Sequence, residues 1–163
     1  AMTIERIRTL AFRSISQIGI RYRDSPLSQT LGSIDDAAPQ AGDRFPWLKL
    51  AVTGSGGVQD LFEMLDDRCF NVLVFGQPAP TSSIVGGGER LRMLAIPDGG
   101  SNRTALAGVG IGGQAFYLVR PDGHIGLAGT RFDEAAVARY FADHHVRVGG
   151  RTHGEPREAA PAL

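Results

Sequence analysis

The sequence has a single cysteine, Cys69, in 163 residues, so it cannot form an internal disulfide. Because disulfides belong mainly to secreted proteins, this shortage favours a cytoplasmic location. The chain also lacks an excess of charge of either sign, with 17 basic and 17 acidic residues. That balance argues against a nucleic-acid partner. No apolar run reaches the roughly 18 residues of a transmembrane helix, so we expect no membrane partner either.

Lysine is almost absent, since Lys49 is the only one and the other basic side chains are arginines. Together with abundant alanine and glycine, this suggests a GC-rich bacterial genome. Hydrophobic residues make up 42% of the chain and charged residues 21%, a composition typical of globular proteins. A chain of this length buries roughly 70% of its unfolded surface, which is enough for a self-sufficient core.

The strongest local pattern lies at residues 116–127, where two short apolar runs flank Pro121-Asp122-Gly123. Proline presets φ, aspartate favours the next turn position, and glycine accepts the left-handed conformation. The pattern predicts a β-hairpin. We expect Arg120, Pro121, Asp122 and Gly123 to be structural residues of its turn. No residue of the chain is assigned a catalytic, cofactor-binding or metal-binding role.

Two amphipathic helices are predicted at opposite ends of the chain. One begins at about Thr130, where Asp133 completes a capping box. Its apolar residues recur at helical spacing and should face a sheet: Phe132, Ala136, Val137, Tyr140 and Phe141. The other covers residues 3–17, and a short strand at residues 17–23 is predicted to follow it.

Further strands are predicted at residues 45–52, 70–75 and 91–96, with helices at 58–65 and around 104–106. This order of elements predicts an α/β fold: a thioredoxin-like mixed β-sheet flanked by helices and lacking the CxxC motif, with an extra N-terminal helix and linker. We expect the first two of these strands to form a parallel βαβ unit and the hairpin strands to be antiparallel.

Composition also predicts the domain organisation. Residues 25–44 are rich in Ser, Asp, Pro, Gly and Ala, which indicates a linker longer than most connections within one domain. We therefore predict a thioredoxin-like domain at residues 45–148 and a flexible, polar tail at residues 149–163. Residues 1–24 form a separate N-terminal part whose helix has no evident local partner.

Dithiol chemistry is the first that a thioredoxin-like fold suggests, and its cysteine pair would follow the strand at residues 70–75. That position reads Gly76-Gln77-Pro78-Ala79 and has no cysteine. Cys69 precedes the strand, and a small buried hydrophobic residue is the better explanation for it. A thiol peroxidase that uses Cys69 stays open as a third hypothesis, with Arg68 as the only local activating cation.

No other motif marks an active site. The glycine groups at residues 54–57, 86–88 and 108–113 lack the spacing and the flanking elements of nucleotide-binding loops. His144 and His145 would point about 100° apart on a helix, so they do not converge on one metal ion. The remaining histidines, His124 and His153, also show no metal-ligand spacing.

Four stretches resemble the C-terminal region of the FAD-dependent aromatic-ring monooxygenases of the phenol hydroxylase, 3-hydroxyphenylpropionate hydroxylase and polyketide hydroxylase type. They are residues 19–27 (GIRYRDSPL), 41–46 (AGDRFP), 70–76 (FNVLVFG) and, most specifically, 117–125 (YLVRPDGHI). In the larger members of that family, a thioredoxin-like domain without the cysteine pair follows the catalytic part. The resemblance implies that residues 1–24 are the tail of that catalytic part. It also implies that FAD and NAD(P)H belong to the full-length enzyme, with none bound by this chain.

The leading hypothesis is therefore a non-catalytic C-terminal domain that assembles or stabilises a FAD- and NAD(P)H-dependent monooxygenase acting on an aromatic ring. Its expected partners are its own upstream catalytic domain and, in a homo-oligomer, further copies of the same protein. The alternative is a stand-alone thioredoxin-like interaction or dimerisation module without redox activity. Under both hypotheses we expect the chain alone to be inactive.

Overall fold

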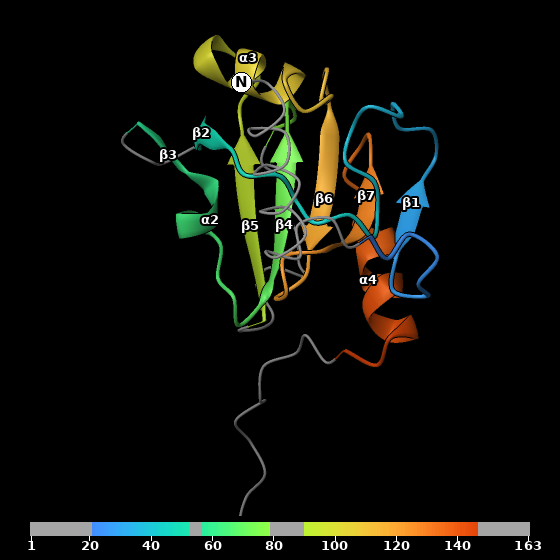
Figure 1. The fold of residues 1–163 in the computed structure, drawn as a ribbon. Coiled ribbons are helices and arrows are strands. Elements are labelled where there is room, and N and C mark those ends of the chain that lie inside the picture. The colour runs from blue at the N-terminus through green and yellow to red at the C-terminus, as the bar shows by residue number, and fades with distance from the viewer. Residues whose placement is uncertain (1–20, 53–56, 79–89, 147–163) are drawn as a thin grey trace, which may run out of the picture.

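The computed structural model describes residues 21–52, 57–78 and 90–146 (Figure 1). The helix predicted at residues 3–17 and the tail predicted at residues 149–163 lie outside these described residues. So does most of the strand predicted at residues 17–23, and its last three residues are not in a strand. In the described part of the chain, no helix is long and apolar enough to cross a bilayer.

A mixed five-stranded sheet forms the centre of the fold (Figure 1). Its strands are β1 (Gln29–Leu31), β4 (Phe70–Phe75), β5 (Leu91–Ile96), β6 (Ala115–Val119) and β7 (Ile125–Gly129), in the order β1-β7-β6-β4-β5. Strand β4 is parallel to β5 and antiparallel to β6, β6 and β7 are antiparallel, and β1 is parallel to β7. A parallel pair, an antiparallel hairpin and a C-terminal helix make the thioredoxin-like arrangement, as the order of elements predicted.

Both faces of this sheet are buried, because its strands divide their side chains between two cores. On β6, Ala115, Tyr117 and Val119 join one hydrophobic cluster, while Phe116 and Leu118 join the other. Successive side chains of a strand point to opposite faces, so a continuous apolar run fits a strand that is covered on both sides.

The β6–β7 hairpin turns through Pro121, Asp122 and Gly123, as the sequence predicted. The Gly123 N–H donates to the Arg120 carbonyl at 2.9 Å. Gly123 has a φ of +81°, the left-handed conformation that glycine adopts without a steric penalty.

Helix α4 (Glu134–Asp143) covers one face of the sheet and buries Val137 and Tyr140 there. Its N-cap is Asp133, whose carboxylate accepts the Ala136 N–H at 3.0 Å. The predicted start at Thr130 is wrong, because Thr130 directly follows β7 and lies outside the helix. Four of the predicted apolar residues are buried in α4, whereas Phe132 precedes the helix and is partly buried; the four are Ala136, Val137, Tyr140 and Phe141.

Small elements and irregular chain cover the opposite face. Strands β2 (Lys49–Ala51) and β3 (Val58–Asp60) form a separate antiparallel sheet, which leads into α2 (Leu61–Met64). Helix α3 (Gly100–Ala107) packs beside β2, and its buried Asn102 joins the two. The Asn102 side-chain amide accepts the Ala51 N–H and donates to the Ala51 carbonyl, both at 2.8 Å.

Two predictions for this face are wrong. The strand predicted at residues 45–52 shortens to β2 and lies outside the central sheet, so β4 pairs in parallel with β5 rather than with the predicted strand. The helix predicted at residues 58–65 begins only at Leu61, because the three residues before it pair with β2. Asp60 then caps α2 by accepting the Phe62 N–H at 2.9 Å. The helix expected around residues 104–106 is present within α3.

The linker predicted at residues 25–44 contains β1, which pairs with β7 and extends the central sheet. Part of this segment is therefore built into the same sheet as the elements that follow it. The domain boundaries near residues 24 and 148 stay predictions.

Candidate functional site

Gln77 occupies the place of a thioredoxin dithiol, two residues after β4. Its side-chain amide donates to the carbonyls of Ala115 and Thr130 at 3.2 and 3.1 Å. It also accepts the Phe132 N–H at 3.0 Å. The Gln77 side chain therefore ties together the ends of β4, β6 and β7. An amide engaged in this way is not a nucleophile, so this position supports neither thiol nor acyl-transfer chemistry.

Cys69 is buried at the other end of β4, with its Sγ 3.8 Å from the Asp66 carbonyl oxygen. Burial raises the pKa of the Cys69 thiol, and the charge of Asp66 adds to this effect while Arg92 and Arg68 oppose it. The Arg68 guanidinium is itself engaged by the Asp66 carboxylate at 3.0 Å. A thiol that stays protonated is a poor nucleophile, so the arrangement disfavours the thiol peroxidase hypothesis.

The three described histidines do not gather into a metal site. His124 lies at the start of the second hairpin strand, and His144 follows α4 with its ring centroid 4.4 Å from that of Tyr140. His153 lies outside the described residues. Across the described ranges, no group of three or more His, Cys, Asp or Glu side chains is placed to hold a metal ion.

Three of the four stretches that carry the family resemblance meet at the turn end of the β6–β7 hairpin. The Tyr22 N–H donates to the Gly42 carbonyl, and the Gly42 N–H donates to the Ile125 carbonyl, both at 2.8 Å. The Ile125 N–H donates in turn to the Asp43 carbonyl at 2.9 Å. We call this region the N-terminal junction, formed by residues 21–28, 40–46 and 123–125.

Gly42 allows the N-terminal junction to close. It has a φ of +89°, and a Cβ there would lie 2.4 Å from the Tyr22 carbonyl carbon and 2.5 Å from the Arg23 nitrogen. Any side chain would force two backbone segments apart, because neither contact involves a movable side chain. This close approach gives a physical reason for glycine in the AGDRFP stretch.

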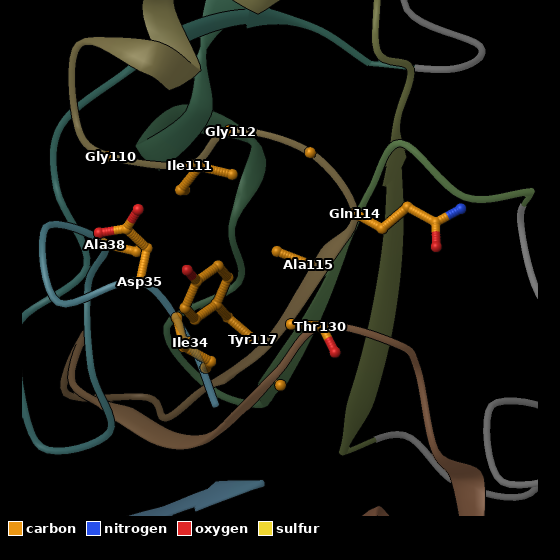
Figure 2. A pocket seen from close by; sticks show the side chains of 12 residues that line it. Ile34, Asp35, Ala38, Gly110, Ile111, Gly112, Gln114, Ala115, Tyr117 and Thr130 are labelled. Atoms are coloured by element: carbon orange, nitrogen blue, oxygen red, sulfur yellow. The ribbon is translucent and has the colours of Figure 1, made fainter. Parts of the chain in front are cut away.

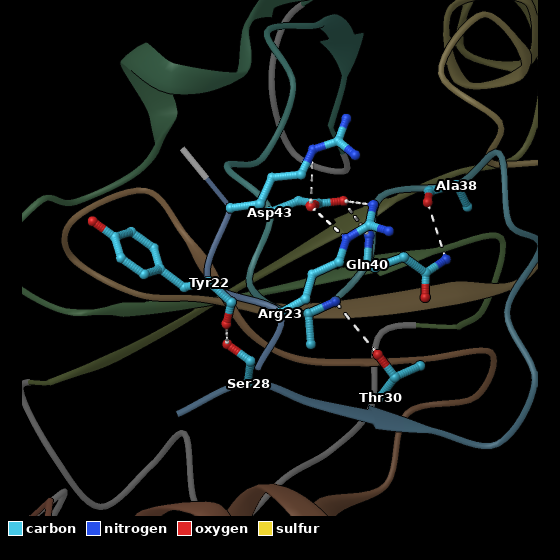
Figure 3. Close-up of polar contacts among 9 residues, drawn as sticks. Tyr22, Arg23, Ser28, Thr30, Ala38, Gln40 and Asp43 are labelled. Carbon is cyan, nitrogen blue, oxygen red and sulfur yellow. Dashed lines mark hydrogen bonds and ion pairs between the residues drawn. The ribbon is translucent and has the colours of Figure 1, made fainter. Parts of the chain in front are cut away.

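Arg23 and Asp43 form a bidentate ion pair in the junction (Figure 3). Arg23 Nε and Nη2 donate to the two carboxylate oxygens at 2.8 and 2.7 Å, and Arg21 lies 3.7 Å from the same carboxylate. Burial by itself would raise the pKa of Asp43, but hydrogen bonds from Arg23 and the Gln40 N–H lower the pKa below its usual value. The bond to Asp43 raises the pKa of Arg23. The pair therefore stays ionised at neutral pH.

Further hydrogen bonds fold this segment onto itself (Figure 3). The Ser28 hydroxyl donates to the Tyr22 carbonyl at 2.7 Å. The Gln40 side-chain amide donates to the Ala38 carbonyl at 3.1 Å. The chain that enters the domain is thus held in a defined path.

The four residues predicted as structural lie at the outer edge of the junction. Arg120 donates to the Asp122 carboxylate, which also accepts the His124 N–H at 3.0 Å. Pro121 is exposed and Gly123 supplies the left-handed turn position. These contacts hold the turn. A purely structural role for the four residues stays a prediction.

A polar hollow of about 510 Å³ opens beside the junction. In the described part of the chain, the Arg44 guanidinium that lines it has no hydrogen-bond or ion-pair partner. Mixed charge on an exposed surface suits contact with another polar protein surface. The charged side chains that line the hollow are Arg21, Arg23, Arg44, Asp36 and Asp43.

Sequence reasoning missed the Arg23–Asp43 pair, although both residues lie in the stretches that carry the resemblance. The two residues are 20 positions apart in irregular chain, where no periodic pattern links them. Opposite charges in neighbouring motifs were the only signal.

Together these observations define a thioredoxin-like domain without the redox pair. The flavin-dependent monooxygenase PieE, in complex with FAD and substrate, is similar to it over 80% of this chain and 26% of its own, with a TM-score of 0.55 and 19% identity. A ternary complex of aklavinone-11 hydroxylase with FAD and aklavinone matches 74% of this chain and 25% of its own, with a TM-score of 0.47 and 20% identity. No protein-family model and no curated protein matches the chain. The chain spans about a quarter of the length of these structures, and the likeness to PieE confirms the predicted resemblance for the fold.

Proposed function

We propose that this chain is the non-catalytic C-terminal domain of a larger FAD- and NAD(P)H-dependent monooxygenase that hydroxylates an aromatic ring. In that enzyme the domain stabilises the whole protein and contributes to subunit contacts. The likeness to PieE carries the proposal, because the fold matches only about a quarter of a flavin-dependent monooxygenase. The remaining parts of such an enzyme would precede this domain.

The N-terminal junction supports an attached role. Residues 21–28 enter the domain beside the hairpin and are fixed there by the approach at Gly42 and by the Arg23–Asp43 pair. A preceding part would then be held in one orientation rather than on a loose tether. The polar hollow lies next to this entry, where a polar surface of the preceding part could pair with Arg44.

We propose that FAD and NAD(P)H bind to the preceding part of the enzyme, and two features of this domain support that placement. The two described cavities, of about 280 and 510 Å³, are small for FAD. The glycine loop at residues 110–113 leads into β6, whereas a dinucleotide site needs a glycine loop at a helix N-terminus to bind the pyrophosphate. The flavin would supply the oxygen chemistry from the preceding part of the enzyme.

The test compares the product of the whole reading frame with a version that ends before residue 21. Both should bind FAD and oxidise NAD(P)H, while the truncated version should have a lower melting temperature and an altered mass by light scattering. Equal melting temperature and mass would overturn the assembly role. A folded truncated version that no longer binds flavin would overturn the non-catalytic assignment. A reading frame that begins at Met2 would instead favour the stand-alone module.

A further inference from the structure

A small cavity lies on the face of the sheet opposite α4, between the segments at residues 34–38 and 110–114 (Figure 2). Its volume of about 280 Å³ suits a compound of single-ring size. The inner wall is formed by buried residues: Ala38, Ile111, Ala115 and Tyr117. The exposed rim carries three polar side chains: Asp35, Gln114 and Thr130.

Gly110 brings the two walls of this cavity together. It has a φ of +80°, and a Cβ there would lie 2.3 Å from the Ala37 carbonyl oxygen and 2.7 Å from the Ala38 nitrogen. Only glycine permits this approach of two backbone segments. At Gly112 and Gly113, by contrast, a Cβ would meet nothing within 4 Å. The close approach at Gly110 therefore fixes the two segments that form the walls of the cavity.

Tyr117 presents its hydroxyl to the cavity on the side of Asp35 and Ala38 (Figure 2). The residue is fully buried, and its ring packs edge-on against Phe45 and Phe75 at centroid distances of 5.3 and 5.9 Å. Its hydroxyl has no hydrogen-bond partner among the described residues. Because a buried hydroxyl without a partner lowers stability, this position favours phenylalanine unless a polar atom from outside the described residues reaches it.

The charges around the cavity favour a neutral ligand. Burial raises the pKa of the Tyr117 hydroxyl, so this group is a neutral hydrogen-bond donor at neutral pH. Among the described residues, Asp35 is the only charged side chain that lines the cavity. Its Oδ1 accepts the Ala37 N–H at 2.8 Å, while Oδ2 has no partner in the described chain and can accept from a ligand. An anion would be repelled by this carboxylate.

We propose that this cavity binds a neutral single-ring compound that carries a carboxamide or lactam group. The carbonyl oxygen of the ligand accepts the hydrogen bond of Tyr117, its N–H group donates to Asp35, and its ring contacts Ile111. The assembly role proposed above does not require this site, so the two proposals succeed or fail independently.

The test is a titration of benzamide into the ¹⁵N-labelled chain, followed by two-dimensional NMR. Saturable shifts are expected at residues 34–38 and 110–115. Tyr117→Phe should weaken the affinity about fivefold, as the loss of one neutral hydrogen bond predicts. Tyr140→Phe is the matched control, because it removes a buried hydroxyl on the opposite face and should leave the affinity unchanged.

Benzoate tests the charge of the site. The affinity for benzoate should be lower than that for benzamide, and Asp35→Asn should reduce this difference in affinity. A well-dispersed spectrum of each variant establishes that it is folded. Saturable shifts that are absent or lie elsewhere, or a Tyr117→Phe variant with wild-type affinity for benzamide, would overturn the proposal.

Discussion

The two faces of the central sheet are covered in different ways. On one face, helix α4 packs regular apolar positions on the strands, and the Tyr140 hydroxyl donates to the Leu27 carbonyl at 3.0 Å. On the other, irregular chain, the β2–β3 sheet and α3 form the cover, and the Tyr117 hydroxyl has no partner in the described chain. Both tyrosines are buried, with exposed fractions of 2% for Tyr140 and 0% for Tyr117. On the α4 face, the buried tyrosine hydroxyl therefore has a hydrogen-bond partner. The opposite face combines a hydrophobic core with a cavity.

This difference follows from the physics of each cover. A helix repeats its apolar residues every three or four positions, so it fills one groove evenly. Irregular segments meet instead at particular close approaches, such as those at Gly42 and Gly110, and they leave gaps between these points. Gaps that contain a few polar groups are where ligands bind. We therefore place the ligand site of this domain on the loop-covered face.

The largest difference between the faces should appear when apolar side chains are truncated. Leu118→Ala removes a fully buried side chain beneath α4 and should cost about 3–5 kcal/mol of unfolding free energy. Ile111→Ala lies at the cavity wall, where packing is already incomplete, and should cost about 2 kcal/mol. Urea denaturation measures both. Equal losses would show that the two faces are packed alike.

The next largest effect concerns how the loop-covered face is closed. Gly110→Ala should destabilise the chain by about 2–3 kcal/mol, because a left-handed φ and a backbone clash add together. Gly112→Ala is the control and should change stability by less than about 1 kcal/mol, since its Cβ meets nothing. Thermal unfolding of both variants checks this. A tolerated alanine at position 110 would disprove the close approach.

The two buried tyrosines should respond differently when the hydroxyl group is removed. Tyr140→Phe leaves the Leu27 carbonyl without its donor and should cost about 1 kcal/mol. Tyr117→Phe removes a hydroxyl that has no partner in the described chain and, without added ligand, should leave stability unchanged or raise it. Denaturation midpoints compare the two variants directly. A clear loss of stability in Tyr117→Phe would mean that its hydroxyl is already satisfied.

The smallest effect concerns the ion pair of the N-terminal junction, on the loop-covered side of the chain. The pKa of Asp43 is lowered on folding, so its contribution is present above the unfolded value near 4 and is lost as the pH falls through the folded pKa. Asp43→Asn should cost less than about 1 kcal/mol at pH 7, since Arg23 is partly exposed. The difference in unfolding free energy between Asp43→Asn and wild type should become smaller at low pH.

Asp24→Asn serves as its control, because Asp24 is exposed and has no partner in the described chain. Its unfolding free energy should equal that of wild type both at pH 7 and at low pH. A difference between Asp43→Asn and wild type that grows on acidification would contradict the assigned ionisation.

The parts of the fold that were predictable are those with local signals. The hairpin follows from Pro121-Asp122-Gly123, and α4 follows from apolar residues at helical spacing. Strand β1 was missed because its three residues are short of apolar pattern and their pairing with β7 joins distant parts of the chain. The strand at residues 58–60 was missed because its register depends on β2.

The site was harder to predict than the fold. The Arg23–Asp43 pair and the cavity beside Tyr117 both depend on irregular segments that meet where a glycine removes the steric barrier. On sequence alone, Gly42 lay in the predicted linker and Gly110 in a glycine group without the pattern of a nucleotide-binding loop. The steric reason for each glycine is apparent only when the backbone segment that packs against it is known.

The visible absorbance of the product of the whole reading frame tests the central claim most directly. The full product and the chain of residues 1–163 would each be purified and their flavin bands compared. We predict stoichiometric bound flavin in the full product and none in the isolated chain. A colourless full product, or flavin that stays bound to residues 1–163, would contradict the assignment of this chain as the non-catalytic domain of a flavin-dependent monooxygenase.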